Sequence, residues 1–412
     1  MGKNILIAAL RENDAAKGKK AKGYFEPSCK RINYPTGFPE LDYTLGYRVM
    51  PEGGEPYNNL GIASGSYVLV MGKSSTGKTA FVIKTCVNIV KPFFDMGGTI
   101  LHFDNERATT YQRVHSLTDV PMDILKESYI IRQEKVSIDD MKASIFELYK
   151  EKTENKEKYE YDTGKLNEFG EQIKLLVPTC VIIDSIANLT ENFKELKDDK
   201  NESIGTQTDR MRLTGEIGRF FNEIMNFLNE ANIIVFAINH IKVNPQLGFI
   251  PTPSEMLYLK QDETLPGGRT QYNLAHLALK FTAIGSEKYD KSEEGFDGFM
   301  NKIEIIKSRT NADGKTVNLI YDKESGHSPI RSTVETLKEL GFVTGNKNGY
   351  SFTTDPDKNK FTLANMEESF NEKRELYKIM IETAKPIFSE YLGTPPGEGA
   401  HEDVSLMAGF YE

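Results

Sequence analysis

Apolar residues along this chain follow two different spacings in turn. Between about residues 35 and 322, short runs that are apolar almost throughout are followed by stretches in which apolar residues recur every three or four positions. The first pattern is typical of strands buried on both faces, and the second is typical of helices that cover a sheet. We therefore predict an α/β fold with a mostly parallel central sheet.

The strands predicted from this pattern are Ser66–Met71, Thr99–Asp104, Tyr129–Arg132, Cys180–Asp184, Asn232–Asn239, Leu277–Ile284 and Asn301–Ser308. The predicted helices are Lys78–Lys91, Thr109–Leu117, Ile138–Glu151 and Glu216–Glu230. The segments 151–165, 191–212 and 242–269 are rich in charged residues or in Pro and Gly, and we expect them to form irregular loops.

The same pattern predicts an arm, a core and a C-terminal unit. Residues 1–35 are basic and contain the aromatic pair Tyr24–Phe25, so we expect them to form an N-terminal arm; an oligomerisation role for this arm is implied only by the family resemblance described below. Residues 36–328 form the predicted core. From residue 329 a helical pattern leads into short strands, which predicts a small α+β unit, 329–412, that ends in an acidic tail.

One short segment carries a complete phosphate-binding motif. VLVMGKSSTGKTAFV contains G-x-x-x-x-G-K-[ST] between a predicted strand and a predicted helix, as that motif requires. Such a turn aims backbone N–H groups at phosphates, Lys78 would contact the β- and γ-phosphates, and the Thr79 hydroxyl would bind Mg²⁺. ATP and Mg²⁺ are therefore the expected cofactors. The residues expected to hold them are Gly72, Lys73, Ser74, Ser75, Thr76, Gly77, Lys78, Thr79 and Ala80.

Two acidic positions complete the predicted site. Asp184 ends a buried strand, where a carboxylate suits the metal side of a nucleotide; the alternative is that it caps the following helix. Glu106 follows another strand, and a carboxylate there can orient and deprotonate the attacking water. Its neighbour Asp104 is expected to support the site. A capping or salt-bridging role for Glu106 is the alternative.

Composition narrows the class of protein only a little. The chain has 412 residues and three cysteines without CxxC spacing, so we expect neither disulfides nor a zinc site, and we expect a cytoplasmic protein. No apolar run is long enough to cross a membrane, and no secretory signal is visible. The formal net charge of −9 does not exclude nucleic acid, because affinity depends on where the basic groups lie.

The order of the motifs resembles the RecA/RadA recombinases, and most closely their phage UvsX branch. The phosphate loop is followed by DNE, VIIDS, FAINH, a Pro/Gly-rich segment ending in LPGG, and LALKF. Shared features include Asn239–His240, Gly267–Gly268 and Lys307–Thr310, and the resemblance covers roughly residues 35–350. It implies a RecA-like P-loop ATPase core and a phage or bacterial origin.

The resemblance also implies a function. It predicts a DNA-dependent ATPase that forms helical filaments on single-stranded DNA and exchanges strands with double-stranded DNA in recombination and repair, with ATP between subunits and with mediator and single-strand-binding proteins as further partners. The segments 191–212 and 242–269 would face the DNA, where basic and aromatic side chains grip phosphates and bases. The residues expected there are Arg210, Arg212, Lys242, Phe249, Gly267, Gly268 and Arg269.

Further roles follow from the resemblance residue by residue. His240 would sense the γ-phosphate and pass the signal to the second DNA-facing segment. Lys307 and Arg309 would reach a neighbour's triphosphate, like an arginine finger. Tyr111 and Arg113 are the expected contacts of the adenine.

Two other classes of protein remain as alternatives. The phrase ERATTYQRVHSL is similar to hexameric replicative helicases, although about thirty-five residues before the core are too few for a folded collar domain, and LPGG favours a recombinase. An ATP-switched binding module is the other alternative. Glu106 argues against it, because a switch has no need of a catalytic carboxylate.

Overall fold

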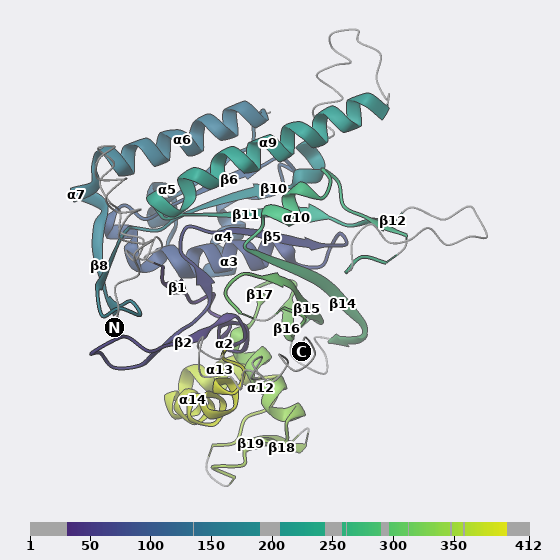
Figure 1. The fold of residues 1–412 in the computed structure, drawn as a ribbon. Helices are drawn as coiled ribbons and strands as arrows, with labels where there is room; N and C mark the ends of the chain where they lie inside the picture. Colours follow the sequence, from purple (N-terminus) through teal and green to yellow (C-terminus); the bar gives the residue numbers. More distant parts are fainter. Residues whose placement is uncertain are drawn as a thin grey trace, which may run out of the picture.

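The computed structural model describes residues 31–134, 136–189, 207–243, 258–260, 262–289, 296–311, 313–346, 348–356 and 359–393. Within these residues the largest sheet has nine strands in the order β17-β16-β15-β14-β5-β11-β10-β6-β7 (Figure 1). Its strands are β5 (Tyr67–Gly72), β6 (Thr99–Asp104), β7 (Tyr129–Arg132), β10 (Thr179–Asp184), β11 (Ile233–His240), β14 (Leu277–Tyr289), β15 (Gly298–Ser308), β16 (Thr316–Asp322) and β17 (Gly326–His327).

The strand pairing confirms the predicted fold class. From β14 through β5, β11, β10 and β6 to β7 every neighbouring pair is parallel, whereas β14 to β17 pair antiparallel. The carboxyl ends of the parallel strands therefore lie on the same side of the sheet, where open α/β sheets bind their ligands. The antiparallel extension widens the sheet beside β5.

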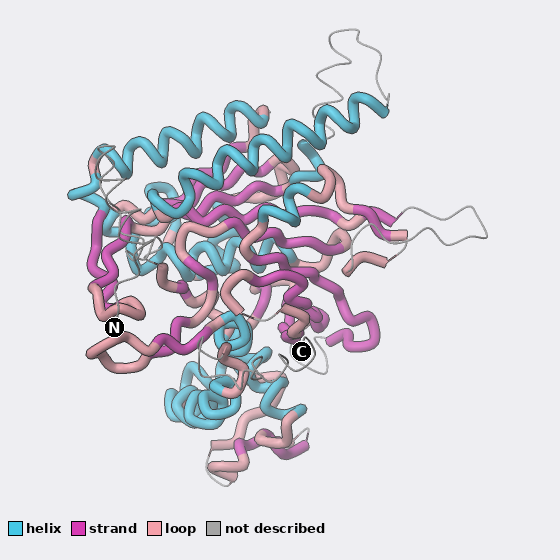
Figure 2. Tube along the Cα trace, in the orientation of Figure 1, coloured by secondary structure: helices cyan, strands magenta, loops and turns pink. Residues whose placement is uncertain are grey.

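Helices cover both faces of this sheet (Figure 2). The helices of one face are α3 (Lys78–Val90) and α4 (Tyr111–Thr118), and those of the other are α6 (Ile138–Glu154) and α9 (Gln207–Ala231). Alternate residues of β5 face the two layers, since Val68 and Val70 belong to one core and Tyr67, Leu69 and Met71 to the other. Burial on both faces explains why these strands are apolar throughout.

Smaller elements surround the sheet. They are β1 (Asn33–Tyr34) paired with β4 (Ile62–Ala63), β2 (Tyr47–Val49) paired with β3 (Tyr57–Asn59), α2 (Pro39–Leu45), the 3-10 helix η1 (Lys91–Met96), α5 (Met122–Ser128) and α10 (Thr270–Leu274). The C-terminal part contains α12 (Pro329–Glu339), β18 (Val343–Asn346), β19 (Gly349–Phe352), α13 (Met366–Glu372) and α14 (Arg374–Ser389). These last elements share a core of their own, at the lower end of Figure 1.

The prediction of an irregular loop at 151–165 is wrong. Helix α6 continues to Glu154, and α7 (Lys156–Tyr159) leads into β8 (Glu160–Leu166), which pairs with β9 (Gln172–Leu176). Tyr161 attaches this hairpin to the core, because its hydroxyl lies 2.7 Å from that of Tyr34 and its ring centroid 4.8 Å from that of Phe93. Ile173 and Leu175 of β9 belong to the same core, and the many charges of the segment 151–165 hid this attachment in the sequence.

Helix α9 also begins earlier than predicted, at Gln207 rather than Glu216. The end of the first predicted DNA-facing segment is therefore helical in the described structure. No helix among the described residues is both long and apolar enough to cross a bilayer.

One buried amino group makes the stability of the protein depend on pH. Lys152 of α6 is only 4% exposed, and its ammonium donates to Val177 O at 2.6 Å and to Thr179 Oγ1 at 3.1 Å. Burial lowers the pKa of Lys152 from 10.5 to about 7. Between these values the folded protein holds fewer protons than the unfolded chain, so this group makes stability rise with pH across that window.

We predict that the free energy of unfolding of the native protein rises relative to that of Lys152→Met between pH 7 and pH 10, by about 2 to 4 kcal/mol. Urea unfolding at several pH values measures the difference. Lys150→Met on the same helix, an exposed position, is the control and should give a constant difference. The prediction would be contradicted if the free energies of unfolding of the native protein and of Lys152→Met changed with pH by the same amount.

Candidate nucleotide-binding and hydrolysis site

The phosphate loop lies between β5 and α3, at the carboxyl edge of the parallel strands. Gly77 has a φ of 74°, in the left-handed region where glycine is favoured, and α3 begins at the next residue. A side chain at Gly72 would place its Cβ 2.6 Å from the carbonyl oxygen of Phe281. Both fixed glycines of the motif are therefore required by the backbone conformation or by close packing.

A cavity of about 570 Å³ opens beside this loop. Its walls come from the ends of β5, β6, β10 and β11, together with α3, α4 and β16. The lining residues are Ser74, Ser75, Thr76, Gly77, Lys78, Thr79, Ala80, Ile83, Glu106, Ala108, Thr109, Arg113, Leu117, Asp184, Ala187, Asn188, His240, Ile241, Lys242 and Tyr321. The structure thus brings most of the sequence-predicted nucleotide and catalytic residues to one place.

Gly72 and Lys73 are not among the residues that line this cavity, and their carbonyls accept hydrogen bonds from within the protein. Gly72 O accepts a hydrogen bond from Ile241 N at 3.1 Å. Lys73 O accepts from Lys78 Nζ at 2.6 Å and from Thr76 Oγ1 at 2.9 Å. Lys73 instead lines a second cavity of about 740 Å³ on the other side of the loop.

Lys78 is the buried cation of the site. It is 4% exposed, and burial lowers the pKa of Lys78 to about 8, against the opposing effect of Asp184 and Glu106. A polyphosphate would bring further negative charge to this ammonium and favour its protonated form. Lys78 is thus suited to contact a phosphate.

Thr79 and Asp184 fit a magnesium site. The Thr79 hydroxyl donates to Asp184 Oδ2 at 2.6 Å, and Asp184 is 3% exposed. Burial raises the pKa of Asp184 to about 6, although the Thr79 hydrogen bond opposes the rise. The second oxygen, Oδ1, is buried and has no hydrogen-bond partner among the residues that the structure describes. An acceptor in that state suits a hard cation or one of its water ligands.

Among the described residues, no group of three or more His, Cys, Asp or Glu side chains forms a metal-binding cluster. This agrees with the chemistry of Mg²⁺, which commonly takes one or two protein ligands and completes its shell with phosphate and water. When bound, the ion would neutralise phosphate charge. Asp104 supports the site from the next strand, because its Oδ2 accepts from Thr109 N and Gln133 Nε2, each at 2.8 Å.

Glu106 and His240 form a hydrogen-bonded pair across the cavity. His240 Nε2 lies 2.8 Å from Glu106 Oε1, and Ser74 Oγ of the phosphate loop lies 3.5 Å from His240 Nδ1. The hydrogen bond from His240 holds the pKa of Glu106 below its usual value, against the opposing effect of burial. Glu106 is therefore ionised at neutral pH, as a carboxylate that orients an attacking water or accepts its proton must be.

The two residues predicted to contact the adenine lie in different surroundings. Tyr111 does not line it, because the Tyr111 hydroxyl donates to Tyr129 O at 3.0 Å and its ring packs against the core. Arg113 does line it, and its guanidinium donates to Glu324 O at 2.6 Å and Lys323 O at 3.2 Å. Tyr321 and Leu117 provide the apolar wall. No motif in the sequence marks Tyr321, which the antiparallel strand β16 carries to the site.

Lys307 and Arg309 lie at the other end of the sheet from the phosphate loop, where the parallel strands begin. Ser308 is paired with Leu277, and Leu277 with Val68 near the start of β5, whereas the phosphate loop follows the other end of β5. The distance is roughly one strand length, about 15 Å. Their side chains donate to backbone carbonyls, Lys307 Nζ to Asn273 O at 2.6 Å and Arg309 Nη2 to the same oxygen at 3.2 Å.

The predicted DNA-facing residues are described only in part. Phe249 lies outside the described residues. Arg210 and Arg212 are on helix α9 rather than in a loop, and Arg212 Nε lies 3.2 Å from Glu216 Oε1. Lys242 is on β12 (Lys242–Val243), which pairs with β13 (Glu263–Thr264), so the segment 242–269 is not wholly irregular.

The glycine pair and Arg269 lie where the second segment closes. Gly267 and Gly268 have φ values of 79° and 77°, and a Cβ on Gly268 would lie 2.4 Å from Thr214 Cγ2 of α9. Close packing against α9 is thus reason enough for glycine at this turn. Arg269 is exposed at the start of α10. DNA contact by these residues stays a prediction.

Fold and site together define a class of protein. A phosphate loop after the central strand β5, with Asp184 at the end of β10 and Glu106 just after the end of β6 in the same parallel sheet, is the arrangement of a RecA-like P-loop ATPase core.

A comparison with family models agrees and makes the class more specific. The model described as "ATPase: KaiC" matches residues 34–239, which is half of the chain. The chain belongs to the KaiC family of ATPases, and membership implies nucleotide binding, typically with Mg²⁺. No curated protein matches the chain. A specific affinity with the phage UvsX branch has no support from these comparisons.

We predict that Glu106→Gln binds ATP with nearly native affinity but hydrolyses it about a hundredfold more slowly, since the amide cannot accept a proton. Phosphate release measures turnover, and a fluorescent ATP analogue measures affinity. Glu127→Gln, on exposed helix α5, is the control and should be as active as the native protein. If Glu106→Gln hydrolysed ATP as fast as the native protein, Glu106 would be excluded as the catalytic carboxylate.

Proposed function

We propose that this KaiC-family ATPase is a DNA recombinase. It forms helical filaments on single-stranded DNA, pairs them with double-stranded DNA and exchanges strands in recombination and repair. ATP lies between successive copies of the chain, and DNA stimulates its hydrolysis. Mediator and single-strand-binding proteins are the further partners proposed.

The observation that carries this proposal is the position of His240. Its imidazole contacts both the catalytic candidate Glu106 and Ser74 of the phosphate loop, while its backbone leads directly into β12 and the segment 242–269. A change in that segment on binding DNA would therefore reach Glu106 through one residue. This supports coupling between DNA and hydrolysis.

Buried hydrogen bonds tie the far end of the same segment to His240. Asn239 Oδ1 accepts from His240 N at 2.9 Å, and Asn239 Nδ2 donates to Pro266 O at 2.8 Å in the LPGG turn. Asn239 Nδ2 also donates to Gln271 Oε1 at 2.9 Å, and Gln271 Nε2 donates to Gly268 O at 3.0 Å. Because both side chains are fully buried, the LPGG turn and the end of β11 are expected to move together.

The position of Lys307 and Arg309 supports assembly with the nucleotide between copies. Neither can neutralise phosphate charge in its own chain from the opposite edge of the sheet. In a head-to-tail assembly, that edge of one copy can approach the phosphate loop of the next. Open head-to-tail assemblies are helical filaments, and closed ones are rings.

We predict that single-stranded DNA raises the ATP turnover of the native protein at least about tenfold, and that His240→Ala loses this stimulation while still binding ATP. Electron microscopy with ATP and single-stranded DNA should show open helical filaments. His115→Ala is the matched control, because the His115 imidazole of α4 lies 2.8 Å from the nearby Val120 carbonyl and does not line the cavity.

The two measurements separate the alternatives. Closed rings with DNA-stimulated hydrolysis would replace the recombinase with a hexameric helicase. Absence of both stimulation and DNA-dependent assembly would contradict any action on DNA, and would leave an ATPase that acts on something else.

A further inference from the structure

Two polar side chains lie buried directly beneath the phosphate loop. Asn301 of β15 and His327 of β17 are both fully buried. His327 is surrounded by aromatic rings, with the centroids of Phe38, Phe81 and Tyr321 between 5.0 and 6.1 Å from its own. Polar groups buried in such surroundings are costly unless they are hydrogen-bonded.

The two side chains are hydrogen-bonded to each other and to the loop. Asn301 Nδ2 lies 2.9 Å from Thr76 O and 3.0 Å from His327 Nε2. A carbonyl can only accept, so the amide nitrogen donates to Thr76 O. Its second hydrogen then points to His327 Nε2, which accepts and leaves the imidazole proton on Nδ1. Burial lowers the pKa of His327 to about 3, so the imidazole is neutral at physiological pH.

This hydrogen bond fixes the orientation of one peptide group in the loop. In a trans peptide the C=O and the following N–H point in opposite directions. Because Thr76 O points down to Asn301, the N–H of Gly77 points up, toward the cavity. The residues on either side of Thr76 have positive φ, 60° at Ser75 and 74° at Gly77, so the backbone turns sharply here. Tyr321 and His327 fill the space beneath Gly77, where a Cβ would lie 2.8 Å from the tyrosine ring.

We propose that Asn301 and His327 are positioning residues for nucleotide binding: Asn301 holds the Thr76–Gly77 peptide with its N–H toward the phosphates, and His327 holds Asn301. Neither side chain lines the cavity, so both act through the loop backbone. The proposal rests on the nucleotide site and is independent of action on DNA.

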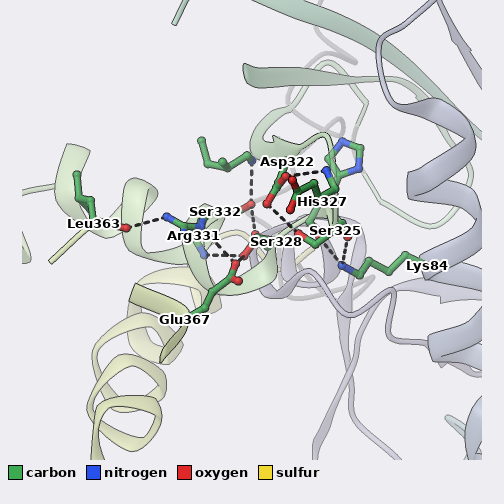
Figure 3. A network of polar contacts seen from close by, with 11 residues as sticks. Lys84, Asp322, Ser325, His327, Ser328, Arg331, Ser332, Leu363 and Glu367 are labelled. Carbon is green, nitrogen blue, oxygen red and sulfur yellow. Dashed lines mark hydrogen bonds and ion pairs between the residues drawn. The ribbon is translucent and has the colours of Figure 1, made fainter. Parts of the chain in front are cut away.

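His327 is itself fixed by a polar network, shown in Figure 3. Lys84 of α3 donates to His327 O at 2.8 Å and to Ser325 O at 3.0 Å. Ser328, the next residue, caps α12 and donates to Glu367 Oε1 at 3.1 Å, and Glu367 also accepts from Arg331. Both the helix that follows the phosphate loop and the C-terminal elements thus hold the β17 strand in place. Movement of His327 away from Asn301 is opposed from two sides.

The test is equilibrium binding of Mg²⁺ with a non-hydrolysable ATP analogue to the full chain without DNA. Asn301→Leu keeps the branched outline of the side chain, with two methyl groups in place of the amide, but leaves Thr76 O without its donor, and we expect affinity to fall about tenfold. In ATP hydrolysis the apparent KM should rise by a similar factor, whereas kcat at saturation should stay within about twofold, because Glu106 is untouched. His327→Phe, which keeps the Asn301 bond to the loop, should weaken binding about threefold.

Ile303→Ala is the matched control, since Ile303 is buried on β15 two residues from Asn301. It should lower the melting temperature but leave nucleotide affinity unchanged. Native affinity in folded Asn301→Leu would overturn the proposal, as would an equal loss in Ile303→Ala, which would assign the effect to general destabilisation. If Asn301→Leu does not fold, His327→Phe decides: native affinity in that variant overturns the proposal.

Discussion

The backbone of the phosphate loop has to present its N–H groups to a charged ligand while its carbonyls turn into the protein, where each needs a donor. A buried carbonyl without a donor costs free energy, so unpaired carbonyls would destabilise this conformation of the loop. The structure supplies these donors from three directions. Gly72 O is bonded to Ile241 N of the strand end, Lys73 O to Lys78 and Thr76 of the loop itself, and Thr76 O to Asn301 of β15. The antiparallel extension of the sheet is therefore part of the nucleotide site, and not only of the scaffold.

The charged side chains of the site are suited to a triphosphate and a divalent cation that would bind between them. Burial works against charge on both Asp184 and Lys78, raising the pKa of the first and lowering that of the second. A triphosphate and a divalent cation would reverse both tendencies, because each brings the opposite charge to its partner. Glu106 differs, since His240 holds its pKa low without any ligand. The carboxylate proposed for hydrolysis is thus ionised in advance, and the residue that lowers its pKa leads to the second predicted DNA-facing segment.

Site residues that lie next to a recognisable motif or strand in the sequence could be predicted. Site residues that reach the phosphate loop from distant parts of the chain could not. The phosphate loop, Asp184 and Glu106 were predictable because each adjoins a buried strand whose apolar pattern gives its direction. Tyr321, Asn301 and His327 reach the loop from strands more than 200 residues further along the chain, and no local pattern marks them. The family resemblance implies an adenine contact for Tyr111, but α4 turns that side chain to the core and Arg113 to the cavity. In the same way, charge composition hid the hairpin β8–β9, which Tyr161, Ile173 and Leu175 attach to the core.

The central claim is that one copy supplies Glu106 and the next supplies Arg309 to the same nucleotide. Mixing Glu106→Gln with Arg309→Ala in the presence of single-stranded DNA tests it most directly, because each variant alone should be inactive. If the two residues act on one nucleotide from neighbouring copies, random head-to-tail assembly of an equal mixture restores about one quarter of native turnover. A mixture as inactive as its components, although both variants assemble, would contradict the account.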